Sequence, residues 1–271
     1  MKNKFLLYID ILGFSELVEQ SPQKIDDLYE VIASLNAHDH EAFKCVIFSD
    51  TILVYNVNGG EYDRDIKYLI MYLCEFARDL LHRLTNRGIL FRAVITNGYF
   101  RHYQLNEVPC FYGTALVKAY LAEKDIKAIG LFIDNALLKY SDIFHTQPFD
   151  DEFSFVFITQ ALNEIEPLCA PTSVPGVGSY LEQTDLTWMG GPELLHIAAV
   201  LNGLKAGYPD PVRLKYSNTV DIFRQRYPKI VSCLESNQLD ITQIAPDADW
   251  APVIQRHPQS CSYAIKSRTE F

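Results

Sequence analysis

Two short apolar runs that almost touch in the sequence limit the fold of this chain more than any other feature. FKCVIF (43–48) and TILVYNV (51–57) are separated only by Ser49 and Asp50. Runs of this length that are rich in β-branched and aromatic residues are typical of strands, and a two-residue connection is typical of a tight hairpin. The chain is therefore expected to contain an antiparallel strand pair, which the rest of the sheet has to extend.

The segments around this hairpin predict an α+β fold. Periodicity predicts, in order, a strand (5–11), a helix that restarts near Ser21 (14–35), the hairpin, a helix (65–86), a strand (89–98), a helix (113–124) and a strand (128–134). This order is that of a ferredoxin-like domain, a mainly antiparallel sheet with helices packed on one face.

Beyond about residue 160 the pattern changes. CAPTSVPGVG (169–178) is rich in Pro, Gly and Ser and is typical of a connection. Two helices are expected after it, Gly191–Lys205 with Pro192 in the first turn, and Asp210–Leu234. We therefore divide the chain into a domain at 1–165 and a partly helical C-terminal extension at 166–271.

Composition narrows the classes of function. The 271 residues are 48% hydrophobic with a formal net charge of −10, which argues against a surface for nucleic acid. No run approaches the roughly 20 apolar residues of a membrane-spanning helix. The six cysteines form no C-x-x-C pair, and reduced thiols in a cytoplasmic protein are expected.

A charge at the end of the first strand points to chemistry. Asp10 ends that strand and Asp50 lies at the hairpin turn, so both carboxylates can meet at one edge of a ferredoxin-like sheet. Paired carboxylates suit Mg²⁺ or Mn²⁺, and the turn Gly13-Phe14-Ser15 leads into a helix whose free N–H groups can hold a triphosphate. Each aspartate alone is an ordinary cap or turn residue, and their conjunction with this turn favours the functional interpretation.

Four segments resemble class III nucleotide cyclases, in the family's order and within roughly the first 140 residues. DILGFSEL (10–17) resembles the metal and phosphate segment, and FSDTILV (48–54) resembles the second metal-binding hairpin. FRAVITNG (91–98) is similar to the R-x-G-I-x-x-G strand, and FYGTALVKAYLAEK (111–124) resembles the G-x-x-V-N-x-A-A-R-L helix.

The chain also departs from that family. The purine-reading lysine falls at Val46 and its partner at Cys110, while the asparagine and arginine that stabilise the transition state fall at Val117 and Leu121. This combination resembles the pyrimidine cyclases of bacterial Pycsar anti-phage systems. That resemblance implies conversion of UTP, with CTP as the alternative, to the 3′,5′-cyclic monophosphate.

The resemblance implies a role for each site residue. Asp10 and Asp50 would bridge two Mn²⁺ or Mg²⁺ ions with the carbonyl of Ile11, and the amides of Gly13, Phe14 and Ser15 would hold the phosphates. Arg92 would supply the positive charge that stabilises the transition state in place of the family's missing residues, in preference to Lys118 and Lys124. Arg92 could equally form a structural ion pair, and the lysines a solvated helix face.

The remaining expectations concern the base and the partners. The resemblance implies that Val46, Phe48, Cys110 and Tyr112 lie near the base, although such residues could equally be core. It also implies a homodimer with active sites at the interface, and a separate effector protein that reads the product. The competing hypotheses are an adenylate or guanylate cyclase and a catalytically inactive cyclase-like module. A nucleotidyl polymerase palm shares the fold and the carboxylates, but it does not need the segments at 91–98 and 113–120.

Overall fold

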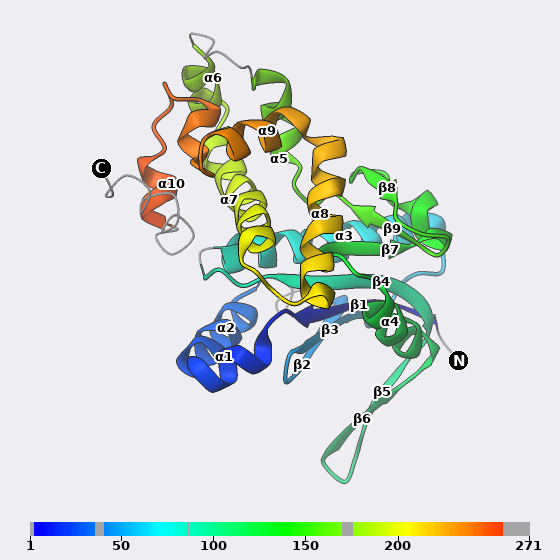
Figure 1. The fold of residues 1–271 in the computed structure, drawn as a ribbon. Coiled ribbons are helices and arrows are strands. Elements are labelled where there is room, and N and C mark those ends of the chain that lie inside the picture. The colour runs from blue at the N-terminus through cyan, green and yellow to red at the C-terminus, as the bar shows by residue number, and fades with distance from the viewer. Residues whose placement is uncertain (1–2, 36–40, 86, 170–175, 257–271) are drawn as a thin grey trace. The chain divides into compact units, whose positions relative to one another are not determined.

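A seven-stranded sheet organises the first part of the chain (Figure 1). The computed structural model describes residues 3–35, 41–85, 87–169 and 176–256. The strands are β1 (Asn3–Ile11), β2 (Phe43–Phe48), β3 (Thr51–Asn56), β4 (Phe91–Tyr99), β7 (Gly130–Asp134), β8 (Thr146–Pro148) and β9 (Phe153–Val156). Their order is β2-β3-β1-β4-β7-β9-β8. All neighbours are antiparallel except β4 and β7.

The first four strands confirm the ferredoxin-like prediction. Their spatial order β2-β3-β1-β4, with helices between β1 and β2 and between β3 and β4, is that of a βαββαβ unit. The helices of this part are α1 (Phe14–Gln20), α2 (Gln23–Ala33), α3 (Asp63–Thr85) and α4 (Thr114–Asp125). The restart that Ser21-Pro22 predicted is the break between α1 and α2.

The expectation that the helices share one sheet face is wrong. Val46 on β2 packs against a core cluster that includes Ala115 and Ala119 of α4. Phe43 lies three residues earlier and therefore points to the opposite face, where its ring stacks on Tyr72 of α3 with centroids 4.4 Å apart. Because β1 is covered on both faces, even and odd positions are buried alike, which explains its continuous apolar run.

A glycine fixes where α4 begins. Gly113 has φ 155°, and a Cβ placed there would lie 2.1 Å from the Tyr99 carbonyl oxygen at the end of β4. Only glycine lets the two backbones come this close. Thr114 then accepts a hydrogen bond from the Tyr99 N–H at 3.1 Å, and Thr96 donates to the Ala115 carbonyl at 3.0 Å. These contacts hold α4 over β1 and β4.

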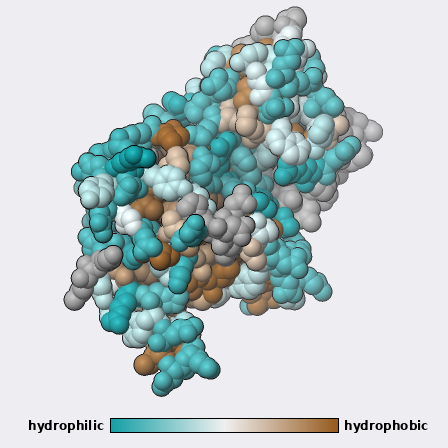
Figure 2. All heavy atoms as spheres, turned by 180° about the vertical axis from the view of Figure 1, so that it is seen from behind, coloured by the Kyte–Doolittle hydropathy of each residue, from teal (hydrophilic) through white to brown (hydrophobic). Residues whose placement is uncertain are grey.

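A two-stranded hairpin projects from the sheet (Figure 1). It consists of β5 (Arg101–Leu105) and β6 (Val108–Tyr112), which the sequence did not predict. Leu105 and Val108 lie at its tip and are 58% and 60% exposed. In Figure 2 the hairpin is the projection at the lower end, where apolar spheres lie among hydrophilic ones.

The chain divides into two compact units. One comprises Met1–Leu80 with Leu90–Ile158, and the other comprises Leu81–Ile89 with Thr159–Phe271. The second unit takes in the C-terminal end of α3 and the helices α5 (Ala161–Ile165), α6 (Val177–Gln183), α7 (Leu186–Lys205), α8 (Asp210–Arg226), α9 (Pro228–Ser236) and α10 (Ala251–Arg256). The functional boundary at residue 165 stays a prediction.

Two predicted helices differ from the observed ones. The helix expected from Gly191 begins at Leu186, so Pro192 lies inside α7 and not in its first turn. The helix expected over Asp210–Leu234 is broken at Tyr227, because Pro228 disfavours helical backbone in the residue before it and starts α9. Most of the connection expected at 169–178 lies outside the described residues, as does Cys261.

Two general expectations concern membranes and thiols. Within the described ranges, no helix is both long enough and apolar enough to cross a bilayer. Cys45, Cys74, Cys110, Cys169 and Cys233 are free thiols.

Candidate functional site

The two predicted metal ligands lie at the same edge of the sheet. Asp10 is the register partner of Thr51, and the Ile11 N–H donates to the Asp50 carbonyl at 3.0 Å. Both carboxylates act on the hydroxyl of Tyr8, whose pKa is raised first by burial and further by Asp10 and Asp50. The structure therefore brings Asp10 and Asp50 together, as their positions on β1 and at the hairpin turn predicted.

The residues on either side of Asp50, Ser49 and Thr51, make contacts that fix the hairpin turn. Thr51 Oγ1 lies 3.4 Å from Asp50 Oδ1 and 3.3 Å from the Tyr8 hydroxyl. Ser49 adopts the left-handed conformation with φ 53°, and its carbonyl accepts a hydrogen bond from the Tyr29 hydroxyl at 3.0 Å. Contacts to β1, β3 and α2 thus fix the turn that carries the carboxylate.

Arg92 holds the other aspartate. Its Nη2 donates to Asp10 Oδ2 at 3.2 Å and also pairs with Glu123 of α4, while its Nη1 donates to the Ile126 carbonyl at 2.6 Å. The Arg92 side chain is only 3% exposed. Burial lowers the pKa of this guanidinium, and the neighbouring Asp10 carboxylate raises it. Arg92 is therefore paired with Asp10, the carboxylate that the sequence predicts as a metal ligand.

The predicted phosphate turn follows directly from β1. Leu12 N–H donates to the Leu90 carbonyl at 2.9 Å, which ties the strand end to the residue before β4. Gly13 turns the chain with φ 72°, and its carbonyl accepts the Leu17 N–H at 3.1 Å. Phe14 and Ser15 form the first turn of α1, where backbone N–H groups have no partner within the helix. The backbone amides of Gly13, Phe14 and Ser15 follow Asp10 by three to five residues.

The four predicted base contacts fall into two groups. Val46 and Phe48 lie on the β2 face that packs against α4, which is also the face of Thr51 and Tyr8. Phe48 is 41% exposed and stacks on Phe111 of β6, with ring centroids 5.5 Å apart. This pair forms an aromatic surface two residues from Asp50.

Cys110 and Tyr112 belong to the second group. Strand alternation points both side chains away from Phe111, to the other face of the β5–β6 hairpin. Tyr112 is paired there with Tyr99, whose hydroxyl lies 3.3 Å from its own, and Cys110 Sγ lies 3.6 Å from the Val108 carbonyl. The structure does not bring these two residues to the face of the aspartates.

The positions on α4 are similarly divided. Lys118 Nζ forms an ion pair with Asp134 Oδ2 at 2.6 Å, at the far end of β7, so it does not join the aspartates. Lys124 lies over the Tyr120 ring at 4.1 Å. Val117 and Leu121, which occupy the family's asparagine and arginine positions, are 57% and 53% exposed.

Sequence reasoning missed three members of the site: Tyr8, Thr51 and Glu123. Tyr8 lies two residues before Asp10 on the same strand face, and Thr51 follows Asp50, so strand periodicity could have placed both. Glu123 could not be placed in this way, because its contact depends on how α4 crosses the sheet.

The residues at this edge of the sheet suit a divalent cation whose remaining ligands come from the substrate and water. Among the described residues, no group of three or more His, Cys, Asp or Glu side chains forms a self-sufficient metal centre. Mg²⁺ and Mn²⁺ commonly take one or two carboxylates and fill the remaining positions with substrate phosphates and water. Asp10, Asp50 and the backbone at Ile11 match that type of site.

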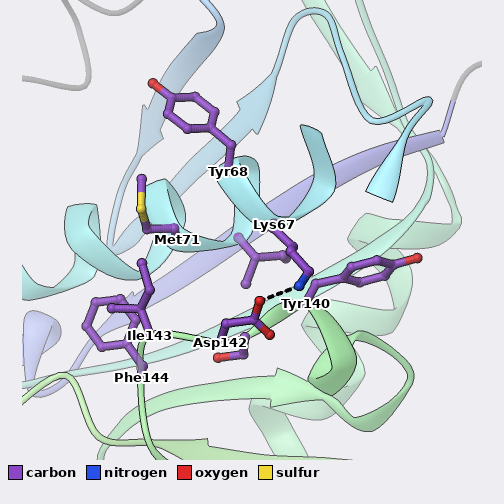
Figure 3. A pocket seen from close by; sticks show the side chains of 9 residues that line it. Lys67, Tyr68, Met71, Tyr140, Asp142, Ile143 and Phe144 are labelled. Carbon is purple, nitrogen blue, oxygen red and sulfur yellow. Dashed lines mark hydrogen bonds and ion pairs between the residues drawn. The ribbon is translucent and has the colours of Figure 1, made fainter. Parts of the chain in front are cut away.

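A pocket in the first unit is lined by a different set of residues (Figure 3). It is lined by residues of α3 and of the segment that ends and follows the 3₁₀ helix η2 (Asn135–Tyr140), namely Lys67, Tyr68, Ile70, Met71, Tyr140, Ser141, Asp142, Ile143 and Phe144. Lys67 and Asp142 form an ion pair across it. Its lining is mainly apolar and includes none of the predicted site residues.

Comparison with known proteins gives distant similarities. No family model and no curated protein matches the chain. Among solved structures, it is similar to the adenylyl cyclase CyaB from P. aeruginosa, with 13% identity and a TM-score of 0.43 over 57% of this chain and 93% of that one. It is also similar to the monomeric guanylyl cyclase domain of the RhoGC fusion protein from the aquatic fungus Blastocladiella emersonii, with 16% identity and a TM-score of 0.46 over 58% of this chain and 95% of that one. Each similarity spans nearly the whole of the solved domain and just over half of this chain.

Proposed function

We propose that this chain is a nucleotide cyclase that converts a nucleoside triphosphate to the 3′,5′-cyclic monophosphate and pyrophosphate. The observation that carries the proposal is the convergence of Asp10 and Asp50 at one sheet edge, directly before the Gly13 turn. A pair of fixed carboxylates beside free helix amides suits a bound metal–triphosphate.

The reaction needs little covalent chemistry from the protein. The ribose 3′-oxygen forms a bond to the α-phosphorus, the bond from that phosphorus to the bridging oxygen of pyrophosphate breaks, and the hydroxyl proton passes to solvent. Two divalent ions would lower the hydroxyl pKa and neutralise phosphate charge. Asp10 and Asp50 would hold the ions, and the amides from Gly13 to Ser15 would orient the β and γ phosphates for in-line attack.

We propose a pyrimidine nucleotide as substrate, UTP with CTP as the alternative. Val46 and Phe48 support this choice, because they present an apolar and an aromatic surface where the resemblance places a purine-reading lysine. An aromatic ring can stack on any base, but it supplies no donor for the purine edge. A role in Pycsar-type anti-phage defence, with a separate effector that reads the product, follows from the same resemblance.

We further propose a homodimer with active sites at the interface. The exposed apolar residues Val117 and Leu121 on α4, and Leu105 and Val108 on the hairpin, support an interaction surface on this unit. Clusters of exposed large apolar side chains are typical of protein contact sites.

Product analysis tests the proposal. Purified protein is incubated with Mn²⁺ and each of the four nucleoside triphosphates, and products are identified by mass spectrometry. We expect a cyclic pyrimidine nucleotide. We also expect Asp50→Asn to lower turnover at least about 100-fold, since an ion ligand loses its charge. Asp27→Asn, at an exposed position of α2, is the matched control and should keep full activity.

The alternatives predict different products. A cyclic purine alone would replace the pyrimidine assignment with an adenylate or guanylate cyclase. Val117 and Leu121, in place of the family's asparagine and arginine, favour a catalytically inactive module as the second candidate. That candidate prevails if folded protein yields no cyclic nucleotide from any of the four triphosphates.

A further inference from the structure

A buried guanidinium is shared between two carboxylates beside the proposed ion site. Arg92 reaches Asp10 from the strand beside β1 and reaches Glu123 from beneath α4. The side chains of Asp10 and Glu123 are 18% and 14% exposed, so water screens these charges only weakly. The Ile126 carbonyl takes a further Arg92 N–H at 2.6 Å and fixes the guanidinium from the end of α4.

Glu123 offsets part of the positive charge that Arg92 places next to Asp10. Arg92 alone would neutralise most of the negative charge that Asp10 offers to a cation. Glu123 takes a share of the same guanidinium, so the three side chains together keep a net charge of −1. With Asp50, the edge of the sheet then presents two negative charges to an ion.

We propose that Glu123 is a positioning residue for the metal site, which acts through Arg92 to keep the Asp10 carboxylate available to a divalent cation. This inference rests on the proposed function, since it takes Asp10 as an ion ligand. Arg92 accordingly serves the metal ligand and not the departing phosphate. Partners of metal ligands of this kind typically change metal affinity or activity 10–100-fold when they are substituted.

Three variants form a cycle that separates charge balance from a structural role. In Glu123→Gln the side chain keeps its size and an oxygen for Arg92, but Arg92 then neutralises Asp10 alone, and Mn²⁺ binding should weaken about tenfold. Arg92→Gln removes the competing charge, so its Mn²⁺ affinity should equal or exceed that of the wild type. The double variant should return to within about threefold of the wild type, because the removed charges cancel.

The measurement is a titration with Mn²⁺ alone at low ionic strength, followed by the electron paramagnetic resonance signal of the free ion. Asp125→Asn removes an exposed negative charge from the same helix without touching Arg92, and should leave Mn²⁺ binding unchanged. Circular dichroism in chelator checks that each variant is folded. If Glu123→Gln does not fold, the direction in which Arg92→Gln changes the Mn²⁺ affinity still distinguishes charge balance from a structural role.

The outcomes separate this inference from the proposed function. A structural role predicts that all three variants bind Mn²⁺ more weakly, with the double variant the weakest, and that result overturns the proposal. Equal affinity in wild type and Glu123→Gln, or no Mn²⁺ binding to the wild type, overturns it as well. If the same wild-type protein forms no cyclic nucleotide, the proposed function fails while the Mn²⁺ series still decides the role of Glu123.

Discussion

A buried histidine in the second unit should make the stability of that unit depend on pH. His196 lies on α7 and is 6% exposed, with the ring of Phe223 edge-on at 6.0 Å between centroids. Burial lowers the pKa of His196 to about 4, and the nearby His82 contributes in the same direction. An unfolded chain would return this pKa to about 6.5.

The sign and size of the effect follow from these two values. Between pH 6.5 and 4 the unfolded state binds a proton that the folded state does not, so stability falls as the pH falls through this window. The contribution of His196 is complete above about pH 6.5. Relative to neutral pH, the loss is about 2 kcal/mol at pH 5 and about 3 kcal/mol at pH 4 and below.

Urea denaturation followed by tryptophan fluorescence measures this loss. Both tryptophans of the chain, Trp188 and Trp250, belong to the second unit, so the signal reports its unfolding. The free energy of unfolding is compared at pH 7.5 and pH 5.0 for wild type and His196→Leu, which keeps an apolar side chain that cannot titrate. Other groups contribute equally to both proteins, and we expect the pH-dependent loss to be about 2 kcal/mol smaller in the variant. Equal losses in the two proteins would refute the reasoning.

Two further predictions concern the first unit. Gly113→Ala should lower its free energy of unfolding by about 3 kcal/mol or more, measured by circular dichroism, because the new Cβ meets the Tyr99 carbonyl at 2.1 Å. Gly59→Ala, whose Cβ would meet its nearest neighbour at 3.9 Å, is the control for positive φ and should cost about 1 kcal/mol. Leu105→Ser combined with Val108→Ser should shift the proposed dimer toward monomer in sedimentation velocity, and unchanged sedimentation would exclude the hairpin tip from the interface.

Strong periodicity made most of the first unit predictable. The long helix α3 buries one face, so its sequence carries a clear helical period, while β1 and β3 are buried on both faces and read as continuous apolar runs. The β5–β6 hairpin buries little and contains Pro109, so RHYQL and VPCFY show neither alternation nor a buried run. An exposed strand leaves no hydrophobic signal to read.

Helix boundaries in the second unit were harder to predict than helix content. Proline favours the first turn of a helix, which predicts a start near Gly191, but the observed helix begins five residues earlier, at Leu186. Proline inside a helix removes one hydrogen bond, and the packing of α7 outweighs that loss, since most of its residues from Gly190 to Leu201 are buried.

Lys118 and Glu123 of α4 show why the aspartates carried by strands could be placed from the sequence while the side chains that contact them could not. Strand ends and a two-residue turn placed Asp10 and Asp50 from the sequence alone, because pairing register fixes position along a strand. The position of a helical side chain depends in addition on the rotation of the helix about its axis and on its shift along that axis. Glu123 follows Lys118 by five residues, which corresponds to about 7.5 Å of rise and well over one turn. Only one of them can therefore reach Arg92. The close contact of Gly113 with Tyr99 sets where the helix starts and so determines which one does. As a result, Glu123 pairs with Arg92, and Lys118 pairs with Asp134.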